Sequence, residues 1–320
     1  MTTPNAARAA TMDQPGRSCP VGYRYSPKDF CRTPELRSDA LYIVGGLYGN
    51  PFALERISDM AHAEADGIDL VFNGDFNWFN IDPGSFVKIN ETVLRHTAIR
   101  GNVETELAHD EDTDGCGCAY PEWVHEDVVT WSNQIMRRLR VTAREHLPIR
   151  DRLAALPMHL VAEVGGVRVA IVHGDAESLA GWSFAHESLS EEANDTRLKE
   201  AFRGANVSLF ASTHTCLPAV RSLVLNEGTS AVVNNGAAGM PNLKGTTFGL
   251  ITRIAIRPAL HPSALSLRLR DLHIDLLMVE YDHACWLEMF RQNWPSGSPA
   301  SLSYLDRIAS GPEFAGPITV

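Results

Sequence analysis

The sequence lacks the features that mark membrane-spanning, exported and nucleic-acid-binding chains. No apolar run in its 320 residues approaches the length of about 20 residues that a membrane-spanning helix needs. Residues 1–18 contain two arginines but no apolar stretch, so we do not expect a secretory signal peptide. There is no block of lysine and arginine, and the net charge is -11. Both facts argue against a nucleic-acid backbone as the partner.

Cysteine is also scarce, and no internal repeat is found. Six cysteines scattered over 320 residues do not form the dense pattern of a disulfide scaffold, so we expect a cytoplasmic protein with reduced thiols. The hydrophobic content of 44% is enough for a substantial core. The chain is therefore expected to fold as a globular enzyme or binding protein.

Composition divides the chain into three segments. Residues 1–38 are rich in Pro, Arg, Ser and Thr, and we expect an N-terminal extension with little regular structure. Residues 39–281 are expected to form the main domain. Residues 282–320, with Trp286, Trp294 and Tyr304, are expected to be a C-terminal arm packed on the core. Two roles of this arm stay open, covering the site or forming a homo-oligomer contact.

The pattern of the main domain predicts an α/β fold. Apolar runs at 41–44 and 68–73 predict strands, and Asn50-Pro51 between them predicts a capped helix start, which makes a βαβ unit. Two later apolar runs flank Gly165-Gly166, a strong hairpin signal. Helical connections early and hairpins late predict two packed mixed sheets with helices outside. Further helices are expected at 83–95, 128–139 and 195–202, and further strands at 97–100, 207–211, 219–225, 230–233, 248–256 and 273–281.

Polar side chains follow four of the predicted strands. They are Asp75, Asn102, His173 and His214. Ligands of open α/β sheets bind at the carboxyl edge of the strands, and carboxylate, amide and imidazole groups bind divalent ions. The pattern therefore predicts a site for one divalent ion. The alternative is that Asp75 and Asn102 only close turns and that the two histidines are hydrogen-bonded core residues.

Taken in order, these strand ends resemble the calcineurin-like metallophosphoesterases, and most closely their small bacterial phosphodiesterase branch. The resemblance covers roughly residues 41–256. It implies a four-layer α/β/β/α sandwich and hydrolysis of a phosphoester by a metal-activated water. The matching segments are Gly46–Asn50, Gly74-Asp75, Gly101–Glu104, His173-Gly174, Thr213–Pro218 and Asn234–Pro241.

The departures from the family pattern fall on one of its two metals. Both metals of the family share the Gly-Asp carboxylate, which is Asp75 here. The ligands private to one metal fall at Gly46, Tyr48 and Cys216, so all three are replaced. Random decay would not be expected to spare one set and remove the other. The resemblance therefore implies one ion per chain, Mn, Zn or Fe, and a small-molecule phosphomonoester or phosphodiester substrate. The retained ligand set is Asp75, Asn102, His173 and His214.

The resemblance also implies supporting roles. The family's general-acid histidine falls at Val103, so protonation of the leaving group is either unnecessary or falls to another residue. The candidates are Tyr48, His125 and His186. Glu104 is expected to orient Asn102, and Asn50 and Gly236 are expected to support the site from neighbouring turns.

The cysteines offer a different chemistry. Cys116 and Cys118 lie just past the Asn102 loop, and Cys216 stands where a metal ligand belongs. The three could rebuild a softer site for zinc or iron, or they could be idle thiols. The leading hypothesis is a metal-dependent phosphoester hydrolase. Its rivals are a catalytically degenerate protein that keeps the fold and binds metal or ligand, and a protein whose thiols bind the metal.

Overall fold

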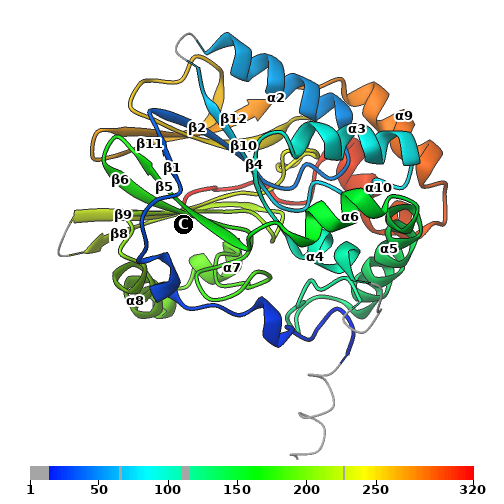
Figure 1. Ribbon diagram of the computed structural model, residues 1–320, viewed down its shortest axis with the longest axis horizontal. Helices are drawn as coiled ribbons and strands as arrows, with labels where there is room; N and C mark the ends of the chain where they lie inside the picture. Colours follow the sequence, from blue (N-terminus) through cyan, green and yellow to red (C-terminus); the bar gives the residue numbers. More distant parts are fainter. Residues whose placement is uncertain (1–13, 65–66, 110–114, 226–227) are drawn as a thin grey trace, which may run out of the picture.

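Two six-stranded mixed sheets form the centre of the molecule, with helices outside them (Figure 1). The computed structural model describes residues 14–64, 67–109, 115–225 and 228–320. The arrangement confirms the predicted fold class of two packed sheets covered by helices. Among the described residues, no helix combines the length and the apolar character that a membrane crossing requires.

The first sheet begins with a parallel βαβαβ run. Its strand order is β11-β12-β10-β2-β3-β4, and the three parallel strands are linked by helices α2 and α3. The Asn50 side chain accepts hydrogen bonds from the backbone N–H groups of Phe52 and Ala53, so it caps α2 as predicted. The elements are β2 (Ala40–Val44), α2 (Pro51–Ala63), β3 (Asp69–Asn73), α3 (Pro83–Val93), β4 (Thr97–Ile99), β10 (Gly249–Ala255), β11 (Ser263–Leu269) and β12 (Leu272–Val279).

The second sheet contains the predicted hairpin. Its order is β1-β5-β6-β7-β9-β8. Strands β5 and β6 pair antiparallel across Gly165-Gly166, which confirms that prediction, and β7 runs parallel to both β6 and β9. Strand β1 lies inside the segment assigned to the N-terminal extension, and the domain boundaries at 38 and 281 stay predictions. The strands are β1 (Leu36–Ser38), β5 (His159–Val164), β6 (Val167–Val172), β7 (Leu209–Ser212), β8 (Pro218–Leu225) and β9 (Gly228–Asn235).

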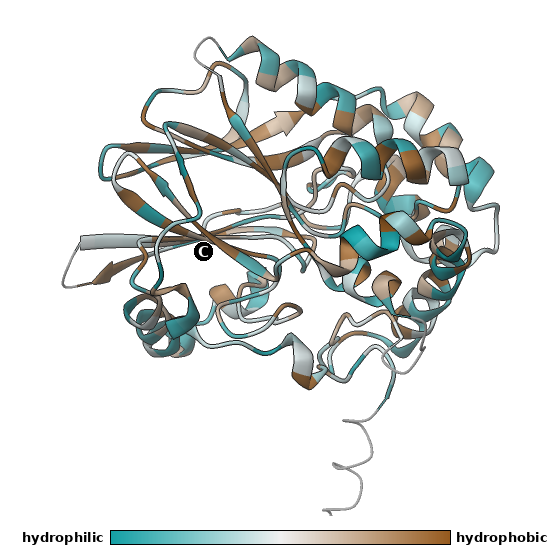
Figure 2. Cartoon of the chain, in the orientation of Figure 1, coloured by the Kyte–Doolittle hydropathy of each residue, from teal (hydrophilic) through white to brown (hydrophobic). Residues whose placement is uncertain are grey.

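Strand β2 shows how the layers are held together. All five of its residues are buried. Leu41 and Ile43 belong to the apolar layer between the two sheets, and Tyr42 and Val44 belong to the layer between the first sheet and its helices. A strand that is covered on both faces needs an apolar residue at every position. Figure 2 shows the result, with hydrophobic residues gathered on the strands and hydrophilic residues along the outer helices.

The remaining helices cover the outer faces and one end of the sheets (Figure 1). Helices α4, α5, α6 and α10 pack on one another at the end that carries the strand-end turns. Helix α8 packs on the second sheet through Leu198 and Phe202. Strands β1 and β11 and helices α4, α6, α9 and α10 were not among the predicted elements. The helices are α4 (Asn102–Ala108), α5 (Glu126–Arg144), α6 (Leu147–Ala154), α7 (His186–Leu189), α8 (Asp195–Ala205), α9 (His283–Asn293) and α10 (Pro299–Ser310).

Candidate metal centre and pocket

Four polar residues converge where the two sheets meet. Asp75 follows β3 and Asn102 follows β4 in the first sheet, while His173 follows β6 and His214 follows β7 in the second. Each of the two pairs of strands is parallel, so the carboxyl ends lie together and deliver their side chains to one place. All four side chains are buried.

The spacing of their polar atoms is that of ligands around one ion. His173 Nε2 lies 3.2 Å from Asn102 Oδ1, 3.2 Å from His214 Nδ1 and 3.3 Å from Asp75 Oδ2. Ligand atoms at about 2.0–2.1 Å from a tetrahedral ion are separated by about 3.3 Å. Among the described residues, Asp75, His173 and His214 form the group of acidic, histidine or cysteine side chains that could hold a metal ion.

The outer side of each ligand is fixed by a backbone carbonyl. His173 Nδ1 bonds to the Asn73 carbonyl at 2.9 Å, and His214 Nε2 bonds to the Cys118 carbonyl at 3.1 Å. A carbonyl can only accept, so in the neutral form of each ring these nitrogens carry the protons and the inner nitrogens carry lone pairs. Asn102 Nδ2 donates to the Cys116 carbonyl at 2.9 Å, which turns its oxygen inward. The inner atoms are therefore acceptors that face one another, an arrangement suited to a bound cation.

The pKa shifts also indicate a place for one positive charge. Burial raises the pKa of Asp75, but the charge of His173 and its hydrogen bond outweigh burial and lower it overall. Burial lowers the pKa of His173, but Asp75 outweighs burial and raises it overall. Burial and then the charge of His173 lower the pKa of His214 to about 3. A positive charge on His173 is therefore favoured over one on His214.

The turns that carry the ligands are tight. Asp75 has φ 52° and His214 has φ 35°, a backbone region that costs a non-glycine residue about 1–2 kcal/mol. A Cβ atom at Gly101 would lie 2.2 Å from Asp75 Oδ1 and 2.8 Å from His173 Cε1, so only glycine permits this approach. Such backbone strain persists where the surrounding structure enforces it, often at functional sites.

Glu104 ties the loop after β3 to the loop after β4. Its buried carboxylate accepts hydrogen bonds from the backbone N–H of Asp75 at 2.7 Å and of Gly101 at 3.0 Å. Burial and then the charge of Asp75 raise the pKa of Glu104 to about 7. Glu104 thus places the Asp75 backbone, whereas the Asn102 amide, which it was expected to orient, is held by the Cys116 carbonyl.

Asn50 and Gly236 lie in turns that support the site. Asn50 caps α2 and donates from Nδ2 to the Gly239 carbonyl at 2.9 Å. The Gly236 carbonyl accepts a hydrogen bond from Thr213 Oγ1 at 2.7 Å, and Thr213 precedes His214. Both residues therefore act on the backbone around the site.

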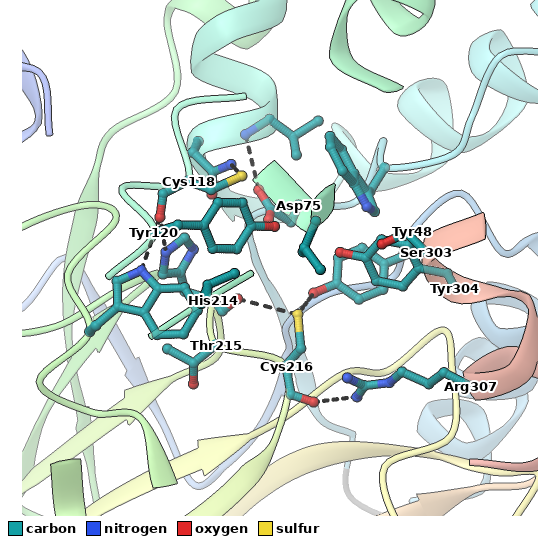
Figure 3. Close-up of a pocket in the computed structure, with 16 residues that line it drawn as sticks. Tyr48, Asp75, Cys118, Tyr120, His214, Thr215, Cys216, Ser303, Tyr304 and Arg307 are labelled. Carbon is teal, nitrogen blue, oxygen red and sulfur yellow. Dashed lines mark hydrogen bonds between the residues drawn. The ribbon is translucent and has the colours of Figure 1, made fainter. Parts of the chain in front are cut away.

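Side chains of the protein occupy the space around the three replaced ligand positions, and two of these positions, Tyr48 and Cys216, lie side by side in Figure 3. Tyr48 is buried, and its ring folds back over Gly46, where an added Cβ would lie 3.0 Å from Tyr48 Cζ. The Tyr48 hydroxyl lies 2.8 Å from Cys216 Sγ. Tyr48 and Cys216 have φ 54° and 65°, so this part of the edge is as tightly wound as the ligand turns.

Cys116 and Cys118 form a disulfide in the structure. The prediction of reduced thiols is therefore wrong for this pair, while Cys19, Cys31, Cys216 and Cys285 are free. The physical reason is the turn at Gly117, which has φ 65° and brings the two flanking Cα atoms to 5.3 Å. With both sulfur atoms bonded to each other, this pair has no thiolate to offer a metal.

A pocket of about 250 Å³ opens beside the converging ligands (Figure 3). Asp75, Asn102 and His214 lie at its base. Its walls come from several further segments, among them the loop after Cys118, the loop at Trp182 and helix α10. The C-terminal segment therefore lines one side of the pocket, and its two open roles stay predictions. The wall residues include Tyr120, Trp182, Ser303, Tyr304 and Arg307.

Two of the three candidate proton donors lie away from the pocket. His125 is exposed at the start of α5, and His186 is bonded to the Pro317 carbonyl at 3.1 Å. Tyr48 lines the pocket. Burial, then Cys216 and Asp75, raise the pKa of Tyr48 well above its usual value, so its hydroxyl is neutral.

Sequence reasoning did not assign Tyr120, Trp182 or Arg307 to the pocket. Tyr120 could have been noticed because it follows Cys118 by two residues. No local pattern marks Arg307, whose guanidinium donates to the carbonyls of Cys216 and Pro241.

Comparison with solved structures finds the same architecture in two proteins of low sequence identity. A metallophosphoesterase from Sphaerobacter thermophilus aligns with a TM-score of 0.53 and 17% identity, over 85% of this chain and 100% of that chain. A hypothetical protein from Pyrococcus horikoshii OT3 aligns with a TM-score of 0.56 and 15% identity, over 86% of this chain and 99% of that chain. No protein-family model and no curated protein sequence matches. The likeness is therefore one of fold.

Proposed function

We propose that this chain, whose fold is that of the metallophosphoesterases, is a hydrolase of phosphoester bonds that works with one divalent ion. Its ligands are Asp75, Asn102, His173 and His214, and the ion is Mn, Zn or Fe. The observation that carries the proposal is the set of inward-facing acceptors around His173 Nε2, at 3.2, 3.2 and 3.3 Å. Each acceptor is oriented from behind, which is how protein sites hold metal ligands.

The residues present fit the chemistry of a phosphoester. When bound, a divalent ion at this position would lower the pKa of a water and polarise a phosphoryl oxygen. Asp75 contributes one negative charge, and Asn102, His173 and His214 are neutral as ligands. The loaded site would therefore keep one net positive charge, which attracts a phosphate ester. Arg307 lines the same pocket and adds a second positive charge.

We further propose that the leaving group departs without a protein acid. Tyr48 is the candidate that lines the pocket, and its hydroxyl is engaged with Cys216 Sγ at 2.8 Å. Its raised pKa keeps the proton on the phenol. Tyr48 then serves to fill the space of the replaced ligands.

The substrate we propose is a small-molecule phosphomonoester or phosphodiester. A pocket of about 250 Å³ is close to the size of small-molecule sites, and the net charge of -11 does not favour nucleic acid. A cytoplasmic location and a homo-oligomer contact stay predictions.

Elemental analysis of the purified protein tests the metal proposal. We expect about one ion per chain in the wild type and in Cys216→Ser, and less than about 0.1 per chain in His214→Ala. His214 is a ligand in the proposal and Cys216 is not, so the two variants form a matched pair. Two ions in the wild type with one lost in Cys216→Ser would overturn the one-metal proposal, as would a wild type without metal.

Hydrolysis is tested separately with an aryl phosphate and an aryl phosphodiester in the presence of Mn²⁺. We expect turnover that a chelator abolishes and that added Mn²⁺ restores. A protein that binds one ion but releases no product from either ester would instead be the catalytically degenerate alternative.

A further inference from the structure

We infer that the pocket selects esters of a single phosphoryl group with a flat aromatic alcohol. The inference rests on the proposed function for the phosphoryl end of the substrate. The ring end rests on a separate set of side chains, the aromatic wall, which we define as Trp182 and Tyr120, the latter labelled in Figure 3.

The aromatic wall starts at a proposed metal ligand. The rings of Trp182 and His214 have centroids 5.5 Å apart and planes at 75°. The ring of Tyr120 lies 5.7 Å from that of Trp182, at 49°. Both wall residues are partly exposed and line the pocket. A ring attached to a phosphoryl group at the centre would therefore reach aromatic surface within a few ångströms.

The polar atoms of the wall are already bonded. Trp182 Nε1 donates to the Cys118 carbonyl at 3.0 Å, and the Tyr120 hydroxyl lies 2.9 Å from Ser132 Oγ. Trp182 and Tyr120 therefore contact a ligand through the surfaces of their rings and not through hydrogen bonds. Val103, Val124 and Val128 continue the apolar lining. Flat π-systems gain from contact with such faces, whereas a polyol would lose hydrogen bonds to water there.

The charges in the pocket suit one phosphoryl group. Asp75 and Arg307 are the acidic and basic residues of the lining. Part of the Arg307 guanidinium is used on the Pro241 carbonyl at 3.3 Å and on the Cys216 carbonyl. Besides the metal site, the lining has one cation, Arg307, to pair with phosphate oxygens, whereas a polyphosphate carries several charged phosphoryl groups. The volume of about 250 Å³ also limits the ligand to a compact ring system.

The chemistry of departure favours the same class. In hydrolysis the oxygen of water forms a bond to phosphorus and loses its proton to solvent. The bond from phosphorus to the ester oxygen breaks, and the electron pair stays on that oxygen. An aromatic alcohol has a pKa of about 10, as tyrosine does, so its anion leaves readily without a protein acid. The hydroxyls of Tyr48 and Tyr120 are engaged elsewhere.

Calorimetric titration of the Mn²⁺-loaded full chain with phenylphosphonate and methylphosphonate tests the inference, because neither is hydrolysed. We expect phenylphosphonate to bind about 10-fold more tightly than methylphosphonate. Trp182→Leu should remove most of this preference and leave the affinity for methylphosphonate within about 2-fold. Trp123→Leu is the matched control, because Trp123 contacts the Trp182 ring at 6.4 Å but is 62% exposed and does not line the pocket.

Equal affinities in the wild type, or a preference that persists in Trp182→Leu, would overturn the inference. If neither phosphonate binds, a titration with phenol separates the two proposals. Phenol bound by the wild type and lost in Trp182→Leu would support the ring site and remove support for a phosphoryl site. No binding of phenol in that case would overturn the ring site as well.

Discussion

The two halves of the site differ in how their polar atoms are paired. We call them the ligand half and the filled half. In the ligand half, inner acceptor atoms face one another at 3.2–3.3 Å with their donors turned outward. In the filled half, a hydroxyl meets a sulfur at 2.8 Å and a ring covers a glycine. The ligand half is Asp75, Asn102, His173 and His214, and the filled half is Gly46, Tyr48 and Cys216.

The difference is what the proposed one-metal centre predicts, with an ion kept in one half only. A buried polar group without a hydrogen-bond partner costs folding free energy. A ligand position that holds no ion is therefore expected to be filled by groups that hydrogen-bond to each other or by apolar side chains. The filled half has been closed in both ways. The ligand half has not, although one apolar substitution among its four residues would relieve the opposition of its acceptors. Its arrangement makes physical sense for a protein that binds a cation there.

The largest effect is expected from breaking the charge of the ligand half with Asp75→Asn. It removes the one formal negative charge among the four ligands, and we expect phosphoester hydrolysis to fall at least about 1000-fold, or about 4 kcal/mol. Steady-state kinetics with an aryl ester measure this. The control variant is Asp195→Asn. Asp195 lies at the start of α8, away from the pocket, and pairs with Arg221, so this change should leave the rate of hydrolysis within about 2-fold. A fall of less than about 10-fold for Asp75→Asn would contradict the assignment.

A pH series sharpens the contrast, because only the ligand half exchanges an ion for a proton. The pKa of His173 is raised overall, with Asp75 outweighing burial, so a proton competes with the metal up to a higher pH than at an ordinary histidine. Below that pKa we expect the Kd for Mn²⁺ to rise about tenfold for each unit that the pH falls, and above it to level off. Titration in a non-coordinating buffer measures the Kd. A pH-independent Kd between pH 5 and 8 would contradict the role of His173.

Rebuilding the filled half should make the two halves alike. The triple variant Gly46→Asp, Tyr48→His, Cys216→His restores the family's ligand types, and we expect its metal content to double to about two ions per chain. Gly46→Asp alone should not achieve this, because the Tyr48 ring lies where the new side chain would begin. Elemental analysis of both variants decides. A triple variant that folds and still holds one ion would show that more than these three residues was lost.

The smallest effect is expected from Tyr48→Phe. It removes the hydroxyl next to Cys216 Sγ but keeps the ring that fills the space. We expect a loss of about 0.5–1.5 kcal/mol in the free energy of unfolding, an unchanged metal content and a change in hydrolysis of less than about 3-fold. Denaturant unfolding and kinetics measure these. A loss of more than about 100-fold in the rate of hydrolysis would indicate that Tyr48 donates the proton to the leaving group, and would contradict the proposal that it only fills space.

The sheets and the ligand positions could be predicted because their signals are local. An apolar run that ends in Gly74-Asp75 specifies a buried strand and the polar residue after it within a few residues of sequence. Strand β11 was missed although it alternates polar with apolar residues, as at Ser266 and Arg268, which is a strand signal. It is an edge strand, and most of its residues are only partly buried. Its place depends on pairing with β12.

The pocket walls could not be predicted for a different reason. Trp182 and Arg307 reach the site from a loop and a helix whose positions are set by tertiary packing. Arg307 depends on the packing of α10 against α5 and on the carbonyl of Pro241. The disulfide likewise depends on the backbone turn at Gly117. Strand periodicity carries no information about such contacts.

The position of Arg307 in α10 has a consequence for the order in which the site matures during synthesis. Roughly 90 residues separate His214 from Arg307, which at about 5–20 residues per second is about 5–20 s of translation. The residues proposed to hold the ion and the two residues of the aromatic wall all leave the ribosome before helix α10, which lines the pocket with Arg307. The positive charge of Arg307 is therefore the last part of the pocket to be synthesised. In a nascent chain of this protein, the proposed ligands and this charge are expected to become available as two successive events.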